Sequence, residues 1–139
     1  MTRVRELIAA GLNVSFGHDC VMDPWYSMGS GDMLEVGHMA IHVAQMTGIE
    51  DKKKIFDALT VNSAKTLGLE GYGLEKGCKA DLVILQAADT LEALRLKPNR
   101  LAVIKGGKVI ARTAPRIGEI FLEGRPQSID GGRDYVPKY

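Results

Sequence analysis

Apolar residues in the first part of the chain recur at helical spacing. Val4, Leu7 and Ile8 fall on one face of a short helix, and Gly11 is placed to end it. A broader stripe predicts the strongest helix of the chain, which begins near Asp32 and is closed by Gly48. Its apolar positions are Val36, Met39, Ala40, Val43, Ala44 and Met46.

Polar residues support the start of this helix, and two shorter helices are expected to follow it. Asp32, with Glu35 three residues later, matches an acidic form of the capping box. The next helices are predicted over residues 51–59 and 62–67, and Gly68 is expected to cap the second of them. The first half of the chain is therefore expected to be mainly helical after residue 32.

A short strand and an unusual loop precede these helices. Residues 12–17 read as a strand that ends in His18-Asp19. Because a helix leads into it within two residues, the pair resembles half of an α/β unit. Residues 20–31 contain proline and glycines, so they are predicted to form a loop. Since this loop also carries Trp25 and Tyr26, we expect it to pack over neighbouring structure.

The second half changes to strands and turns. Dense apolar runs predict a strand over 81–85 and one more over 117–122, with a short helix over 89–96 between them. The Gly106-Gly107 pair predicts a hairpin over 101–112. The polar Gly/Pro-rich end, residues 123–139, is expected to be a tail. The fold class is therefore α/β.

Composition and charge narrow the function classes. The 139 residues are 45% hydrophobic and 25% charged, with a net charge of +1, so nucleic acid is not an expected partner. Cys20 and Cys78 are too far apart for a metal knuckle, which favours a reducing cytoplasm. We expect no membrane span and no secretory signal. A complete (β/α)8 barrel needs about 250 residues, more than this chain has.

The histidines and Asp19 are the first candidates for chemistry. His38 and His42 are four residues apart on the predicted helix, and with Asp19 they would make a three-ligand zinc site. Met39 stands where a zincin would have its glutamate, which favours ordinary surface or core histidines.

Asp19 and Trp25 each have two interpretations. A carboxylate at the end of a strand can face a pocket, or it can cap a turn. Trp25 can belong to that pocket, or it can fill a gap in a core. Spacing alone leaves both alternatives open.

Two stretches resemble a known family. The runs 17–19, 23–26 and 31–34 (Gly-His-Asp, Asp-Pro-Trp-Tyr and Gly-Asp-Met-Leu) resemble the last barrel strand and following loop of bacterial cytosine deaminases. The stretch from Thr60 to Leu85, with Ala80-Asp81-Leu82 near its end, is similar to the C-terminal signature of the whole amidohydrolase superfamily. The resemblance extends over residues 2–130.

This resemblance implies a fold and a reaction. The fold would be the C-terminal fragment of a (β/α)8 metal-dependent hydrolase barrel with strands of an appended β-sandwich. Residues 1–70 would hold the last helix–strand unit and following helices, 71–125 the sandwich strands and 126–139 a polar tail. The reaction would deaminate a free base, such as cytosine to uracil, in pyrimidine salvage. Homo-oligomers are expected.

The resemblance also assigns roles. One divalent metal ion, zinc or iron, would be held by histidines on other strands and by Asp19. Asp19 would also move a proton between the bound water and the leaving ammonia, which makes it the catalytic residue. Trp25 would pack beside the base, and His18 would lie near the site without a role. The helix carrying His38 and His42 would lie outside the barrel.

Two departures from the family pattern limit these expectations. The chain has no HxH pair, so Asp19 alone would not retain a metal ion and the isolated chain is expected to be inactive. Cys20 stands where cytosine deaminases often have another acid, which leaves cytosine, isocytosine-like bases and aminotriazines open. The alternative function is a non-catalytic oligomerising or binding module that keeps part of the fold.

Overall fold

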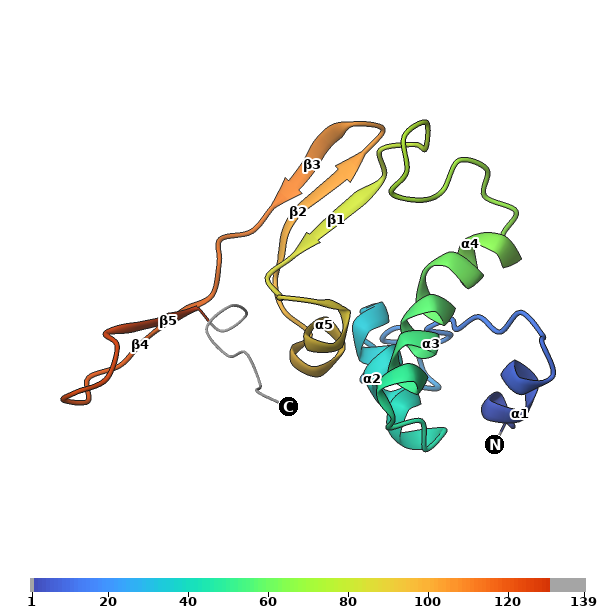
Figure 1. Ribbon diagram of the computed structural model, residues 1–139, viewed down its shortest axis with the longest axis horizontal. Helices are drawn as coiled ribbons and strands as arrows, with labels where there is room; N and C mark the ends of the chain where they lie inside the picture. The colour runs from blue at the N-terminus through green and yellow to red at the C-terminus, as the bar shows by residue number, and fades with distance from the viewer. Residues whose placement is uncertain (1, 131–139) are drawn as a thin grey trace. The chain divides into compact units, whose positions relative to one another are not determined.

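The computed structural model describes residues 2–130 and divides the chain into two units between Gly73 and Leu74. The first unit contains four helices among its described residues (Figure 1). They are α1 (Val4–Ala9), α2 (Met33–Val43), α3 (Ile49–Leu59) and α4 (Val61–Thr66). α3 packs against both α2 and α4.

Glycine ends two of these helices as the sequence predicts. Gly11 has a φ of 78°, and its N–H donates to Ile8 O while Leu12 N–H donates to Leu7 O. Gly68, with a φ of 63°, ends α4 with the same pair of bonds, to Lys65 and Ala64. A left-handed residue at this place satisfies carbonyls that a helix leaves unpaired, so these endpoints are set locally.

The helix predicted over 32–48 is shorter, and its buried face differs from the expected stripe. α2 ends at Val43 because Gln45 adopts a left-handed φ of 53° and Met46 N–H donates to Ile41 O. Gly48 therefore begins α3 rather than closing α2. The buried residues of α2 are Leu34, Gly37 and Ile41, whereas Met39 and Val43 are exposed. Because α2 is apolar on several sides, periodicity alone did not identify the buried face.

The start of α2 is capped in a modified form of the predicted box. Asp32 Oδ1 accepts from Leu34 N–H at 2.8 Å. Glu35 does not reach back to Asp32; its carboxylate accepts from the Ser30 hydroxyl, whose oxygen in turn accepts from Asp32 N–H at 3.2 Å. The Ser30 hydroxyl therefore stands between Asp32 N–H and the Glu35 carboxylate, which bond directly in an ordinary capping box.

The strand predicted over residues 12–17 is not formed. A strand needs a neighbouring strand for its backbone groups, and residues 2–130 place none beside this segment. The helices bind it instead. Phe16 N–H donates to Ala58 O at 3.1 Å, and Asn62 Nδ2 donates to Val14 O at 3.0 Å. The segment is therefore fixed by the ends of α3 and α4.

The second unit is built on an antiparallel sheet of order β1-β2-β3, and its described elements also include one helix and a separate two-stranded ribbon (Figure 1). The elements are β1 (Leu82–Leu85), α5 (Thr90–Leu96), β2 (Arg100–Lys105), β3 (Lys108–Arg112), β4 (Ile117–Glu119) and β5 (Ser128–Asp130). The mixture of helices and strands confirms the α/β class in its coarse sense.

The β2–β3 hairpin forms as predicted. Gly106 and Gly107 have φ values of 54° and 76°, which a two-residue turn of this kind requires. Asp81 holds the turn, since Gly106 N–H donates to its Oδ1 at 2.7 Å and Lys105 Nζ donates to its Oδ2. The Lys105 ammonium, followed by the Gly106 N–H, lowers the pKa of the Asp81 carboxyl.

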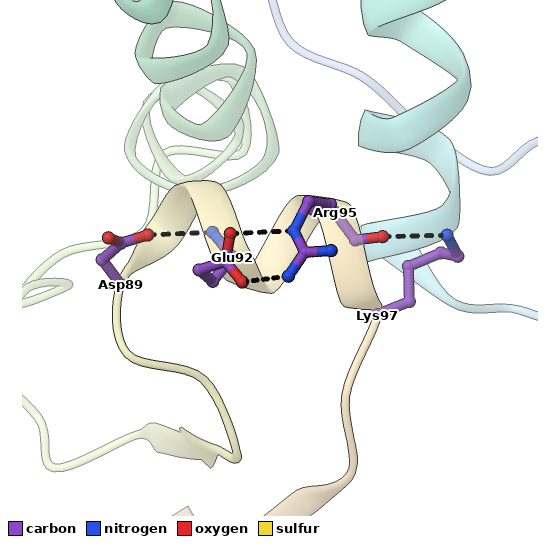
Figure 2. A network of polar contacts seen from close by, with 4 residues as sticks. All are labelled: Asp89, Glu92, Arg95 and Lys97. Carbon is purple, nitrogen blue, oxygen red and sulfur yellow. Dashed lines mark hydrogen bonds and ion pairs between the residues drawn. The ribbon is translucent and has the colours of Figure 1, made fainter. Parts of the chain in front are cut away.

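Local polar contacts also define α5 (Figure 2). Asp89 Oδ1 accepts from Glu92 N–H at 2.8 Å, which caps the helix start. Glu92 is buried, and the Arg95 guanidinium pairs with both of its carboxylate oxygens. Lys97 adopts a left-handed φ of 48° directly before Pro98, so the helix ends where the sequence predicts.

One buried side chain ties residues 116–130 to the end of β1. Gln86 accepts from Arg116 N–H at 2.7 Å and donates to Arg116 O and to Asp130 Oδ1. β4 confirms the last predicted strand, although it is shorter than expected. β5 lies inside the segment expected to be a tail, and residues 131–139 of that prediction lie outside the described residues.

No helix between residues 2 and 130 combines the length and the apolarity that crossing a bilayer requires.

The buried face of α3 generates a prediction for stability. Ile55 is fully buried, so Ile55→Ala should lower the free energy of unfolding by about 2–5 kcal/mol. The exposed neighbour Lys54 is the matched control, and Lys54→Ala should change it by less than about 0.5 kcal/mol. Equilibrium urea denaturation measures both. Equal effects of the two substitutions would contradict the assigned face.

The Asp81 contacts predict a pH dependence. Because the folded state lowers the pKa of this carboxyl, its contribution is present above the unfolded-state pKa and is lost as pH falls through the folded-state pKa. The stability difference between the wild type and Asp81→Ala should therefore shrink on acidification. Thermal unfolding across a pH series tests this, with Asp81→Asn keeping the acceptor for Gly106 but not the ion pair. A constant difference across the series would refute it.

Candidate functional site

Asp19 lies at the end of the segment that α3 and α4 fix. It adopts a left-handed φ of 65°, which is uncommon for a residue other than glycine. Its side chain is exposed, and it makes no hydrogen bond or ion pair with any residue from 2 to 130. The neighbouring backbone therefore holds Asp19 in a strained conformation, and its carboxylate stays available.

His18 binds both ends of the loop that follows. Its Nδ1 lies 2.9 Å from Cys20 O, and its Nε2 accepts from Gly31 N–H at 3.1 Å. The ring is half-buried. The loop of residues 20–31 is thus closed at its base by one imidazole.

Asp23 organises the middle of the loop. Its Oδ1 accepts from Trp25 N–H and Tyr26 N–H, both at 3.0 Å, which makes a turn around Pro24. The Tyr26 N–H is the main cause that lowers the pKa of Asp23. The same carboxylate accepts from the Cys20 thiol, and this contact, followed by burial, raises the pKa of Cys20. Asp23 is therefore a structural carboxylate, in contrast to Asp19.

Backbone packing completes the loop. Gly29 is buried, and a Cβ built on it would lie 2.2 Å from Cys20 O and 2.9 Å from Val21 Cα. Only glycine permits this approach without movement of the backbone. Residues 20, 23, 29 and 31 together fold the loop on itself.

The apolar side chains of the loop do not pack over the first unit as expected. Trp25 is 85% exposed, Met22 80% and Met28 75%. Trp25 therefore fills no gap in a core formed by the described residues. The loop holds its own backbone in place and presents an indole to whatever lies beside it.

The zinc site considered from Asp19, His38 and His42 is not formed. The His38 and His42 rings contact one another, with centroids 5.1 Å apart. Nevertheless, no three histidine, cysteine, aspartate or glutamate residues within the described part of the chain could hold a metal ion together. The two histidines therefore form a ring contact within α2.

Sequence reasoning identified Asp19 and Trp25 but missed the residues that fix their surroundings. Asp23 had a recognisable signal, because aspartate directly before proline favours the start of a turn. His18 had none, since its partner Gly31 lies 13 residues away and contributes only its backbone.

The Cys20–Asp23 contact generates a prediction. Asp23→Asn removes the negative charge but keeps an acceptor for the two N–H groups, so the pKa of Cys20 should fall. The thiolate fraction, and with it the rate of alkylation by iodoacetamide, should rise at mildly alkaline pH and converge with the wild type at higher pH. Peptide mapping by mass spectrometry measures the rate, with Cys78 as the internal control. An unchanged Cys20 rate would disprove the contact.

Several known proteins are similar to this chain over most of its length. 5-Methylcytosine deaminase from Klebsiella pneumoniae, solved with phosphonocytosine, is 40% identical with a TM-score of 0.79, covering 84% of this chain and 28% of that one. N-isopropylammelide isopropyl amidohydrolase from Pseudomonas sp. (strain ADP) is 34% identical over 78% of this chain. Pterin deaminase from Rhizobium rhizogenes is 31% identical over 86% of it.

The match is to one part of these proteins. The chain spans 27% of the length of each of the two curated relatives. The model of the amidohydrolase family itself matches residues 1–111, which include Asp19, the loop and the turn of the β2–β3 hairpin. The chain therefore belongs to the amidohydrolase family.

Proposed function

We propose that this chain is the C-terminal part of a metal-dependent hydrolase that removes an amino group from a free nitrogen heterocycle. The fold proposed for it is the end of a (β/α)8 barrel with strands of a β-sandwich. The observation that carries the proposal is Asp19, an exposed carboxylate without a partner that stands in a strained conformation before an ordered loop. Strain of this kind is concentrated at functional sites.

The described residues do not fit a metal ion by themselves. A catalytic metal site takes about three protein ligands, and residues 2–130 bring together no such group. Asp19 offers one carboxylate. We therefore assign the remaining ligands, and the choice between zinc and iron, to parts of the parent enzyme beyond this sequence.

Asp19 is proposed to act in two ways. Its carboxylate would contribute one ligand to the metal ion of the parent enzyme. The same group would accept and return a proton during hydrolysis, because its oxygens make no other bonds with the described chain. Asp23 is a poorer candidate for this role, since backbone N–H groups, including those of Trp25 and Tyr26, already donate to it.

Trp25 is proposed to pack beside the base. Its backbone N–H is fixed by Asp23, and its indole is 85% exposed. A flat apolar side chain on an ordered turn is suited to contact with a planar heterocycle, because aromatic rings stack with large buried area. In the parent enzyme, the bound base would cover the indole that is exposed in this chain.

The proposed substrate class is an aminated pyrimidine or a related heterocycle. The relatives named above support it, since 5-methylcytosine and pterin are both aminated nitrogen heterocycles. Cytosine, isocytosine-like bases and aminotriazines are the candidates, with a place in pyrimidine salvage if cytosine is the substrate. We also propose a cytoplasmic homo-oligomer that uses neither nucleic acid nor a membrane as partner.

A non-catalytic module is the second candidate. Met39 and Val43 are exposed on α2, and an apolar pair on a helix face suits an oligomer contact. This function predicts that the loss of Asp19 leaves every property of the parent unchanged.

The deaminase proposal is tested on the complete parent enzyme. Asp19→Asn, which tolerates the left-handed conformation, and Asp19→Ala should both abolish ammonia release from cytosine and the other candidate bases. Trp25→Ala should raise KM by about 5-fold or more, since stacking of a base on an aromatic ring is worth about 1–3 kcal/mol. Phe121, another exposed aromatic residue, is the matched control, and Phe121→Ala should leave KM unchanged. Turnover retained in Asp19→Ala would exclude the proposed function.

A further inference from the structure

Both ring nitrogens of His18 are engaged in the free chain. Nε2 accepts from Gly31 N–H, so it must carry a lone pair. Nδ1 lies 2.9 Å from a carbonyl oxygen, which can only accept, so it must carry the proton. One neutral tautomer, protonated at Nδ1, satisfies both contacts. No lone pair is left on the ring for another partner.

The two bonds have different consequences for the loop. The bond to Cys20 O reaches across Asp19, and it therefore restrains the peptide groups on both sides of the left-handed residue. The bond to Gly31 N–H fixes the far end of the loop, directly before the Asp32 cap of α2. His18 thus connects the backbone around Asp19 to the helix that follows.

We propose that His18 is a positioning residue that sets the orientation of Asp19 through Cys20 and the placement of the Trp25 loop through Gly31. This role rests on the proposed function of Asp19 and Trp25. It is distinct from that of a metal ligand or a proton carrier, because either would need the Nε2 lone pair that Gly31 occupies.

Two conservative variants separate the bonds in the parent enzyme. Asparagine places a donor near the Nδ1 position, so His18→Asn should keep the Cys20 contact and lose the Gly31 contact. Glutamine reaches the Nε2 position, so His18→Gln should do the reverse. We expect His18→Asn to raise KM with kcat nearly unchanged, and His18→Gln to lower kcat.

Removal of both contacts shows how much His18 contributes to kcat/KM. His18→Ala should reduce kcat/KM by roughly 10- to 100-fold, the usual effect of losing a group that orients a metal-site residue. Exposed His42 supplies the control variant, and His42→Ala should keep wild-type kinetics. Equal loss of kcat in all three His18 variants, or wild-type kinetics in His18→Ala, would each overturn the proposal.

A spectroscopic measurement tests the contacts without depending on activity. In the parent enzyme labelled with ¹⁵N-histidine, the imidazole signal that disappears in His18→Ala should show a neutral ring protonated at Nδ1. A ring protonated at Nε2 or at both nitrogens would overturn the assignment. If the expected tautomer is found in a protein that releases no ammonia from any candidate base, the proposed function fails while the loop contact stands.

Discussion

The candidate site depends on how the backbone of residues 12–19 is satisfied. A strand in a sheet would exchange hydrogen bonds with neighbouring strands, and the described chain contains none beside this segment. The end of α3 and the side chains of α4 replace them, with Asn62 bonded to Val14 O and Ala58 O bonded to Phe16 N–H. These contacts are few, but they fix the segment up to the residue before Gly17. Everything that follows, from His18 to the cap of α2, takes its position from this segment.

Local bonds then replace a hydrophobic core in the loop of residues 20–31. His18 closes the base, Asp23 forms the central turn, and Gly29 packs its backbone against Cys20. The side chains of His18 and Asp23 bond to the backbone of Cys20, Trp25, Tyr26 and Gly31, so the loop is held at these points. Its large apolar side chains, Trp25 among them, remain exposed. The loop is therefore ordered and apolar at the same time, which is the combination that a binding surface for a planar ligand requires.

The parts of the fold that the sequence predicted correctly are those with signals a few residues long. The Gly106-Gly107 turn and the glycines after α1 and α4 all act within one turn of the chain. The strand over 12–17 failed because its existence depends on partners that the described chain does not supply. The buried face of α2 was predicted wrongly because the helix is apolar on several sides, and its end was predicted wrongly because Gln45, an ordinary residue, takes the left-handed position. In the site, Asp19 and Trp25 came from the resemblance to a family, and nothing in their spacing separated them from a turn cap and a core residue. The role of His18 could be found only in the three-dimensional structure, because it bonds to a backbone group 13 residues away, whereas the turn at Asp23 had a signal in the proline that follows it.

The two aspartates of this region show how similar side chains four residues apart take different roles. Asp23 accepts from the N–H groups of Trp25 and Tyr26 and from a thiol, and these contacts lower its pKa. Its role is therefore to hold the turn of the loop. Asp19 has no such partner, yet its backbone is held at a φ of 65° by the residues around it. A turn cap would gain its stability from the side chain, as Asp23 does. An unpartnered carboxylate in a strained conformation gains nothing locally, so its surroundings must be stabilised elsewhere, here by His18 and by the helix contacts of the preceding segment. This asymmetry, rather than the position of either residue in the sequence, is the physical argument for placing the chemistry at Asp19.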